Sequence, residues 1–212
     1  MLLRRKVLLA VTLFAAIVLF IAVSSGCNCT KVDSSLSVNE TQEELQEKYK
    51  DNPELFEATM YAYHFGTTIE EAQNRFNIGN AFSGLDTELE REEPETFGGL
   101  WIQHEPSFCV VIAFTRDGEE TIKKYVSENL TGYVEVRIVK YSMKELWKAR
   151  NQVEAFLREN DIPFDSGIYV MDNRVEINVT DRTEIDKAIE DGRLIIPECV
   201  YINVVSGLAV PE

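Results

Sequence analysis

Catalytic and metal-binding sites are most often built from histidines, serines, cysteines and clustered carboxylates. In this chain, few of these residues have the spacing that such a site requires. Its 212 residues include only two histidines, and neither has a second histidine or cysteine at zinc-ligand spacing. His104 precedes Glu105 in an expected hairpin turn, where we expect a solvated side chain. His64 ends an expected helix, where we expect a capping or core role. We predict no metal site and no cofactor.

A serine nucleophile is not indicated either. No G-x-S-x-G motif occurs, and the serines of FSGLD (82–86) and FDSG (164–167) have no histidine at a matching position. The acidic run DTELEREEPE (86–95) could collect calcium, but it lacks the alternating pattern of a calcium loop, so we expect a solvated helical face. The sequence predicts a protein that is not an enzyme. The alternatives are an enzyme with an acidic cleft and a purely structural surface protein.

Four cysteines are present, and their pairing is left open by the sequence. Cys27 and Cys29 are too close together to staple a large loop. Cys109 and Cys199 each open an expected strand, so both a disulfide between them and two separate small buried residues are compatible with the pattern.

The N-terminus predicts where the protein is located. The basic stretch MLLRRK precedes an uncharged apolar run (7–23) and then SSGCNCT, an order typical of a secretory signal. The run lies between a cleaved signal and a minimal membrane span of about 17–25 residues. Ser25, Gly26 and Cys27 resemble a lipoprotein cleavage box in which Cys27 is acylated, and an uncleaved anchor is the alternative. Both place the folded part outside the cytoplasm, tethered to the cell membrane.

The charge balance excludes one class of partner. The chain has 21 basic and 36 acidic residues, a net charge of -15, and three of its basic residues lie in the first six positions. An acidic surface repels phosphate backbones, so we expect no nucleic-acid partner.

Most of the elements that must position these side chains can be predicted from periodicity. A polar stretch (31–40) is expected to be a spacer, and Pro53, Gly66 and Pro94 mark helix boundaries. The expected helices cover residues 41–50, 53–65, 67–76, 80–93 and 143–160.

The second half contains a repeat in which each copy is strand, strand, helix, strand. The first copy comprises 100–103, 109–115, 119–128 and 134–141, and the second comprises 168–171, 174–180, 183–191 and 200–205. Val110, Ile112 and Phe114 are expected to face one way, as are Val175, Ile177 and Val179. One small sheet with one helix buries too little alone, so the duplication builds a core.

Val111 and Ala113 make the first copy apolar on both faces, and the N-terminal helices are expected to cover its far side. Trp101 and Trp147 are both expected in the core. An exposed Trp101 would instead mark a partner-binding residue.

The sequence therefore predicts an α+β protein with an N-terminal membrane-targeting helix, a helical segment and two related α/β units joined by a long helix. The expected divisions are a signal or anchor (1–30), a spacer with a charged helix (31–52), a helical segment (53–96), the first unit (97–142), a linking helix (143–161), the second unit (162–206) and a tail (207–212).

Several of these segments, taken in order, resemble a known family. The resemblance runs from about residue 54 to residue 206 and is carried by HFGTTIEEAQNRF, LDTELEREEP, TFGGLWIQ, AFT, IPFDSGIYV and NRVEINVT. In that order they resemble the pro-regions of extracellular chymotrypsin-like bacterial proteases of the alpha-lytic protease and streptogrisin group.

The resemblance implies two small α/β subdomains joined by a helix, which cradle a protease, accelerate its folding and inhibit it through a C-terminal tail. No protease domain follows Glu212 in this sequence, so we expect binding or inhibition of a separate extracellular protease or other envelope protein. The expected partner-binding residues are Trp101 and, in the tail, Gly207, Leu208, Ala209 and Val210.

Overall fold

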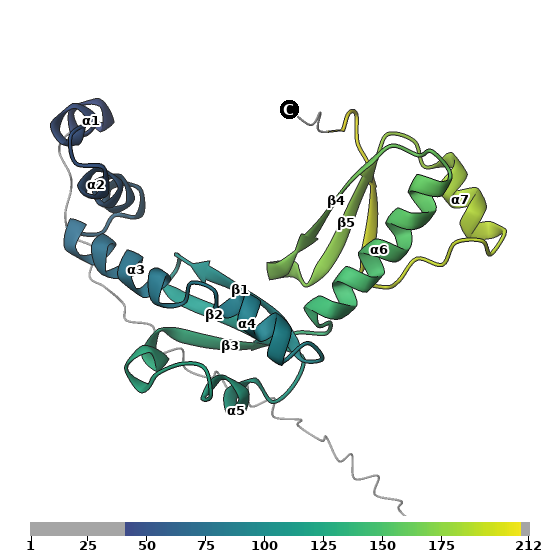
Figure 1. The fold of residues 1–212 in the computed structure, drawn as a ribbon. Coiled ribbons are helices and arrows are strands. Elements are labelled where there is room, and N and C mark those ends of the chain that lie inside the picture. The colour runs from purple at the N-terminus through teal and green to yellow at the C-terminus, as the bar shows by residue number, and fades with distance from the viewer. Residues whose placement is uncertain (1–40, 209–212) are drawn as a thin grey trace, which may run out of the picture.

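A computed structural model describes residues 41–208 and gives the protein an α+β fold with two three-stranded mixed sheets (Figure 1). Each sheet is built from one continuous stretch of chain, so the two lie in separate halves. Within the described residues, no helix is both long enough and apolar enough to cross a lipid bilayer. The expected signal or anchor segment (1–30) lies outside the described residues.

Four helices come first, and their boundaries follow the caps in the sequence. They are α1 (Gln42–Tyr49), α2 (Pro53–Phe65), α3 (Ile69–Ala81) and α4 (Leu85–Glu92). Gly66 ends α2 in the left-handed conformation, and the Thr68 hydroxyl accepts a hydrogen bond from the Glu71 amide at the start of α3. The single helix predicted for 80–93 is wrong, because a turn with Gly84 at φ +81° separates α3 from α4.

The first unit follows the predicted strand, strand, helix, strand order. It contains β1 (Phe97–Gln103), β2 (Cys109–Phe114), α5 (Gly118–Ile122), the 3-10 helix η1 (Glu128–Tyr133) and β3 (Val134–Ile138). The central strand β2 runs antiparallel to β1 and parallel to β3. The helix predicted for 119–128 is shorter, since it gives way to turns and then to η1.

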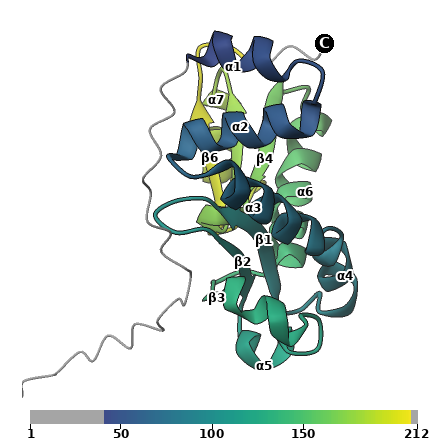
Figure 2. The same cartoon turned by 90° about the vertical axis from the view of Figure 1, so that its left-hand side faces the viewer.

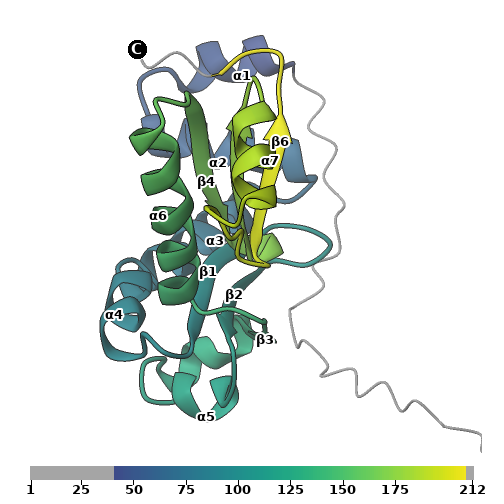
Figure 3. The same cartoon turned by 90° about the vertical axis from the view of Figure 1, so that its right-hand side faces the viewer.

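The second unit repeats this connectivity. It contains β4 (Phe164–Tyr169), the 3-10 turn η2 (Val170–Asp172), β5 (Arg174–Val179), α7 (Thr183–Glu190) and β6 (Val200–Val204). Strand β5 is central, antiparallel to β4 and parallel to β6. The long helix α6 (Met143–Glu159) precedes the unit and packs on β4 and β5, so it forms part of this unit as well as joining it to the first. Figure 3 shows α6 and α7 in front of the second sheet.

The inward side chains of the central strands form one continuous core. Val110, Ile112 and Phe114 face the same way, and Val175, Ile177 and Val179 do so in the second unit, as predicted. Side chains of α3, α4 and α5 cover this face of the first sheet, and Figure 2 shows α3 in front of it.

The expectation that N-terminal helices cover the far face of the first sheet is therefore wrong. Val111 on that face is fully buried, and its covering side chain is Trp101. The helices pack on the opposite face because their apolar side chains join Ile112 and Phe114 in the main core.

The two units meet where β1 begins. A β-carbon added to Gly99 would lie 2.2 Å from Cγ1 of Val170, so the η2 turn packs directly against the backbone of β1. Gly99 also adopts φ +130°, a conformation that favours glycine. The Asn173 side chain accepts a hydrogen bond from the Tyr141 amide and donates one to the Tyr141 carbonyl, both at 2.8 Å. These contacts fix the angle between the two sheets.

Candidate functional site

The far face of the first sheet carries an aromatic residue stacked with an arginine. Trp101 packs on Val111, and the guanidinium of Arg137 lies 5.0 Å from the centre of its ring. Glu135, two residues away on β3, accepts a hydrogen bond of 2.6 Å from Arg137. The ion pair balances the arginine, and a half-buried tryptophan is left at the surface. Trp101, expected in the core, thus lies at its edge.

The uncovered face of the second sheet has the same chemistry. Arg174 lies 6.0 Å from the ring of Tyr169 and 5.3 Å from that of Tyr201, on the strands to either side. It forms ion pairs with Glu176 at 2.6 Å and Asp172 at 3.3 Å. Both tyrosines are about half exposed. Because α6 and α7 cover the other face, these aromatic rings are open to a partner.

The two uncovered faces meet at the η2 turn. A hollow of about 370 Å³ lies at this joint and is lined by residues that include Tyr141, Asn173, Arg174 and Tyr201. In Figure 1 the second sheet turns its uncovered face toward the first unit. We call this region the two-sheet surface and define it by the side chains of Trp101, Glu135, Arg137, Tyr169, Arg174 and Tyr201.

A second concavity lies between the α2–α3 helix pair and the β1–β2 turn. Its volume is about 630 Å³, and Tyr61, Arg75 and His104 contribute to its lining. We call it the helical cleft. His104 reaches it because the turn that follows β1 folds back toward α2.

His104 is half-buried and hydrogen-bonded, so the prediction of a solvated turn side chain is wrong. The Tyr61 hydroxyl lies 2.8 Å from Nδ1 of His104, and Nη1 of Arg75 donates to the same hydroxyl at 3.3 Å. The hydrogen bond between Tyr61 and His104 occupies Nδ1, so Nε2 is the ring nitrogen that remains for a ligand. The His104 ring also stacks on Phe65, with 4.9 Å between ring centres.

The surroundings of His104 favour its neutral form. Burial lowers its pKa below the ordinary 6.5, and the positive charges of Arg75 and His64 lower it further. Arg75 is itself buried and donates to Glu71 at 2.9 Å. The imidazole of His104 is therefore mainly neutral at neutral pH. His64 lies at the end of α2, exposed, with its ring edge against Phe65.

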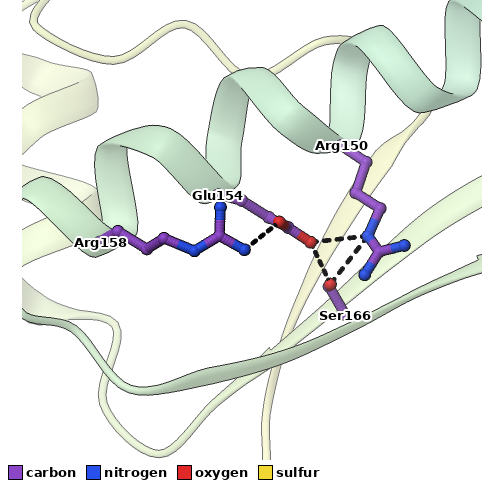
Figure 4. A network of polar contacts seen from close by, with 4 residues as sticks. All are labelled: Arg150, Glu154, Arg158 and Ser166. Carbon is purple, nitrogen blue, oxygen red and sulfur yellow. Dashed lines mark hydrogen bonds and ion pairs between the residues drawn. The ribbon is translucent and has the colours of Figure 1, made fainter.

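Ser166, one of the serines beside an acid, belongs to a polar network between α6 and β4 (Figure 4). It donates to Glu154, which also accepts from Arg150 at 2.6 Å and Arg158 at 2.5 Å. Burial raises the pKa of Glu154, but these hydrogen bonds outweigh burial and the pKa is lowered. A carboxylate held ionised in this way is a poor base, so the network ties helix to sheet and does not activate Ser166.

Cys109, the first residue of β2, and Cys199, which precedes β6, are both free and buried, so the bridge that the sequence left open does not form. Burial raises the pKa of Cys109 to about 11, and the nearby Glu135 carboxylate adds to the shift. Burial also raises the pKa of Cys199. Both thiols are protonated near neutral pH and are therefore poor nucleophiles.

The remaining expected site residues fall at the edges of the described chain. Gly207 is exposed and Leu208 half-buried, just beyond β6, whereas Cys27, Ala209 and Val210 lie outside the described residues. Trp147, expected in the core, is 42% exposed; it lines a small hollow with Glu90 and Pro94, and Arg150 lies over its ring. Among residues 41–208, no three histidine, cysteine or carboxylate side chains converge to hold a metal.

Comparisons with known proteins add no relative: no family model matches the chain, and no curated protein matches it. The resemblance to protease pro-regions therefore rests on the residues quoted above and stays a prediction.

Sequence reasoning missed most of the residues that form these two regions. No local sequence pattern marks Arg137, Arg174, Tyr61 or Arg75 as a site residue. One signal was available: Tyr169 and Tyr201 occupy outward positions of β4 and β6, next to the inward residues Ile168 and Ile202. Large aromatic residues on a solvent face suggest a binding surface.

Proposed function

We propose that this protein is a non-catalytic binding protein, tethered to the cell membrane by its N-terminus, with its folded part on the extracytoplasmic side. Its partner is an extracellular chymotrypsin-like protease, which it binds and inhibits in the manner of a detached pro-region. The two-sheet surface is the observation that carries this proposal. The tether rests on the apolar run at 7–23 and on Cys27.

The composition of the two-sheet surface supports a protein partner. Tryptophan, tyrosine and arginine are the residues most enriched at the energetic centres of interfaces, and the surface presents all three. Its arginines are already paired with Glu135 and Glu176, so a partner need not supply charges to bury them. The joint between the sheets gives the surface a concave centre, which suits a convex protein partner.

The alternative of an enzyme in the helical cleft is less well supported. Burial and the charge of Arg75 lower the pKa of His104, which makes it a weaker base than a solvated histidine. The described lining of the cleft contains no serine, threonine or cysteine that His104 could activate. We therefore place the function of the protein in binding.

Binding to a purified streptogrisin-type protease tests the proposal directly. The full-length chain in a neutral detergent is immobilised, and protease binding and residual peptidase activity are measured. Replacing Trp101 or Tyr201 with alanine is expected to weaken binding about 30-fold each, the usual loss at an interface centre. Trp147→Ala is the matched control, because this exposed tryptophan also stacks with an arginine but lies on α6, away from the surface.

Two results would contradict the proposal. One is the absence of binding to any protease of this class; the other is an equal loss from Trp147→Ala.

A chain ending at Ser206 tests the tail separately: if Gly207 and the residues after it enter the protease cleft, inhibition falls while binding through the two-sheet surface persists. Labelling with a radioactive fatty acid, with Cys27→Ser as control, decides between a lipid and an anchor.

A further inference from the structure

The helical cleft has a lining that the binding of a protease does not explain. Of the charged side chains in its described lining, Arg75 is paired with Glu71, whereas Glu54 and Glu57 have no ion-pair partner. Both glutamates are exposed and lie three residues apart on α2, on the same side of the helix. The unpaired charge of the cleft is therefore negative, and the cleft favours a cation.

Three amide side chains form a row along the α3 wall of the cleft. Gln73, Asn77 and Asn80 are exposed, and their spacing of four and three residues places them on one face of the helix. At 1.5 Å per residue the row is about 10 Å long, which matches about three residues of an extended chain. An amide side chain both donates and accepts, as does a peptide group.

The floor of the cleft adds a polar ring nitrogen among apolar walls. His104 is held by Tyr61 through Nδ1 and by the ring of Phe65, and Nε2 is its remaining ring nitrogen. Ile102 and Phe108 contribute apolar surface beside it. A ligand that suits this arrangement has peptide groups, which both donate and accept, and a positive charge.

We propose that the helical cleft binds an extended peptide segment that carries a lysine or arginine side chain. The peptide groups pair with the amide row on α3 and with Nε2 of His104, and the cationic group lies between Glu54 and Glu57. This site is separate from the two-sheet surface and goes beyond the proposed function. It would let the protein hold a basic segment of a partner or of a second envelope protein.

Fluorescence anisotropy with the full-length chain in a neutral detergent tests the site. The probe is a rhodamine-labelled, C-terminally amidated hexapeptide, Ala-Ala-Lys-Ala-Lys-Ala, and the comparison peptide replaces both lysines with norleucine. At low ionic strength the lysine peptide is expected to bind about fivefold more tightly, the upper range for ion pairs to exposed carboxylates. Unlabelled 1,5-diaminopentane is the competitor that distinguishes a free diamine from a peptide.

Matched variants separate the cleft from general charge attraction. The double change Glu54→Gln with Glu57→Gln is expected to remove the preference for lysine. The control changes Glu184→Gln with Glu190→Gln on α7, which alters the net charge equally on an exposed helix elsewhere and is expected to leave binding unchanged. Asn77→Ala is expected to weaken the peptide about threefold through one lost hydrogen bond, without affecting the diamine.

The outcomes are decisive in both directions. Equal binding of the norleucine peptide, an equal loss in the α7 control, or a diamine that binds as well as the peptide would each overturn the proposal. Trp101→Ala and Tyr201→Ala are expected to leave peptide binding intact, so failure of the cleft and failure of the two-sheet surface remain distinguishable. Circular dichroism of each variant confirms that the fold is retained.

Discussion

The two α/β units share one connectivity but differ in the far face of the central strand. In β2 all six residues are buried, whereas β5 alternates between buried and half-exposed positions. The parallel ladder begins at Val110 in the first unit and at Val175 in the second, so these two residues are equivalent. Val111 is then equivalent to Glu176, and Ala113 to Asn178. In the first unit, side chains of α3, α4 and α5 cover one face of β2 and Trp101 covers Val111 on the other, whereas the second unit leaves one face of β5 partly solvated. The same topology therefore supports a central strand buried on both faces in one unit and a half-exposed strand in the other.

Exchanging the corresponding residues Val111 and Glu176 gives the largest expected effect. Val111→Glu places a carboxylate beneath Trp101. It is expected to lower the free energy of unfolding by about 3–5 kcal/mol, because the charge is buried without an ion-pair partner placed to compensate it. Glu176→Val removes only a partly solvated ion pair with Arg174 and is expected to change stability by less than about 1 kcal/mol. Urea denaturation measures both, and equal losses would show that the two faces do not differ.

A matched pair of glycines tests the joint between the units. Gly99→Ala forces a β-carbon against Val170 at φ +130° and is expected to cost about 2–3 kcal/mol. Gly167→Ala on β4 meets only the Tyr169 ring at 3.5 Å and is expected to be neutral within about 1 kcal/mol. Thermal unfolding compares the two variants. If Gly99→Ala is as stable as Gly167→Ala, the close packing of η2 on β1 is disproved.

The buried carboxylate between α6 and β4 distinguishes the second unit in a further way. Glu154→Gln weakens the hydrogen bonds from Arg150, Arg158 and Ser166 and is expected to cost about 1–2 kcal/mol at pH 7. The folded pKa of Glu154 lies below its ordinary 4.5, so its stabilisation is present above pH 4.5 and is lost as the pH falls through the folded pKa. Urea midpoints from pH 7 to pH 3 measure this. Glu154→Gln should show a flatter profile, and parallel profiles would contradict the assignment.

The smallest expected effect concerns His104, which ties the β1–β2 turn of the first unit to α2. Its folded pKa lies below 6.5, so the unfolded chain binds the proton more readily. The stabilisation is therefore present above about pH 6.5 and declines as the pH falls below that value toward the folded pKa. Melting temperatures between pH 8 and pH 5 should fall more for the native chain than for His104→Asn. A steeper fall for His104→Asn would reverse the assigned direction.

The sequence by itself determined the repeating elements. Alternation of Val110, Ile112 and Phe114, and of their counterparts Val175, Ile177 and Val179, specified both central strands and their inward faces. Pro53 and Gly66 located the start and the end of α2. These features are local, because a pleat or a cap is fixed by neighbours within a few residues.

Only the tertiary structure decided which surfaces stay open and which residues meet. Each of three contacting pairs joins residues from different elements, so no local spacing in the sequence predicts the contact. The pairs are Trp101 with Arg137, Arg174 with Tyr201, and Tyr61 with His104. The sequence allowed the helices to cover either face of the first sheet. In the structure their apolar side chains pack on the face that contains Ile112. The opposite face of the first sheet is therefore covered by Trp101 and the η2 turn. The burial of a strand residue depends on what packs against the strand and not on the strand alone.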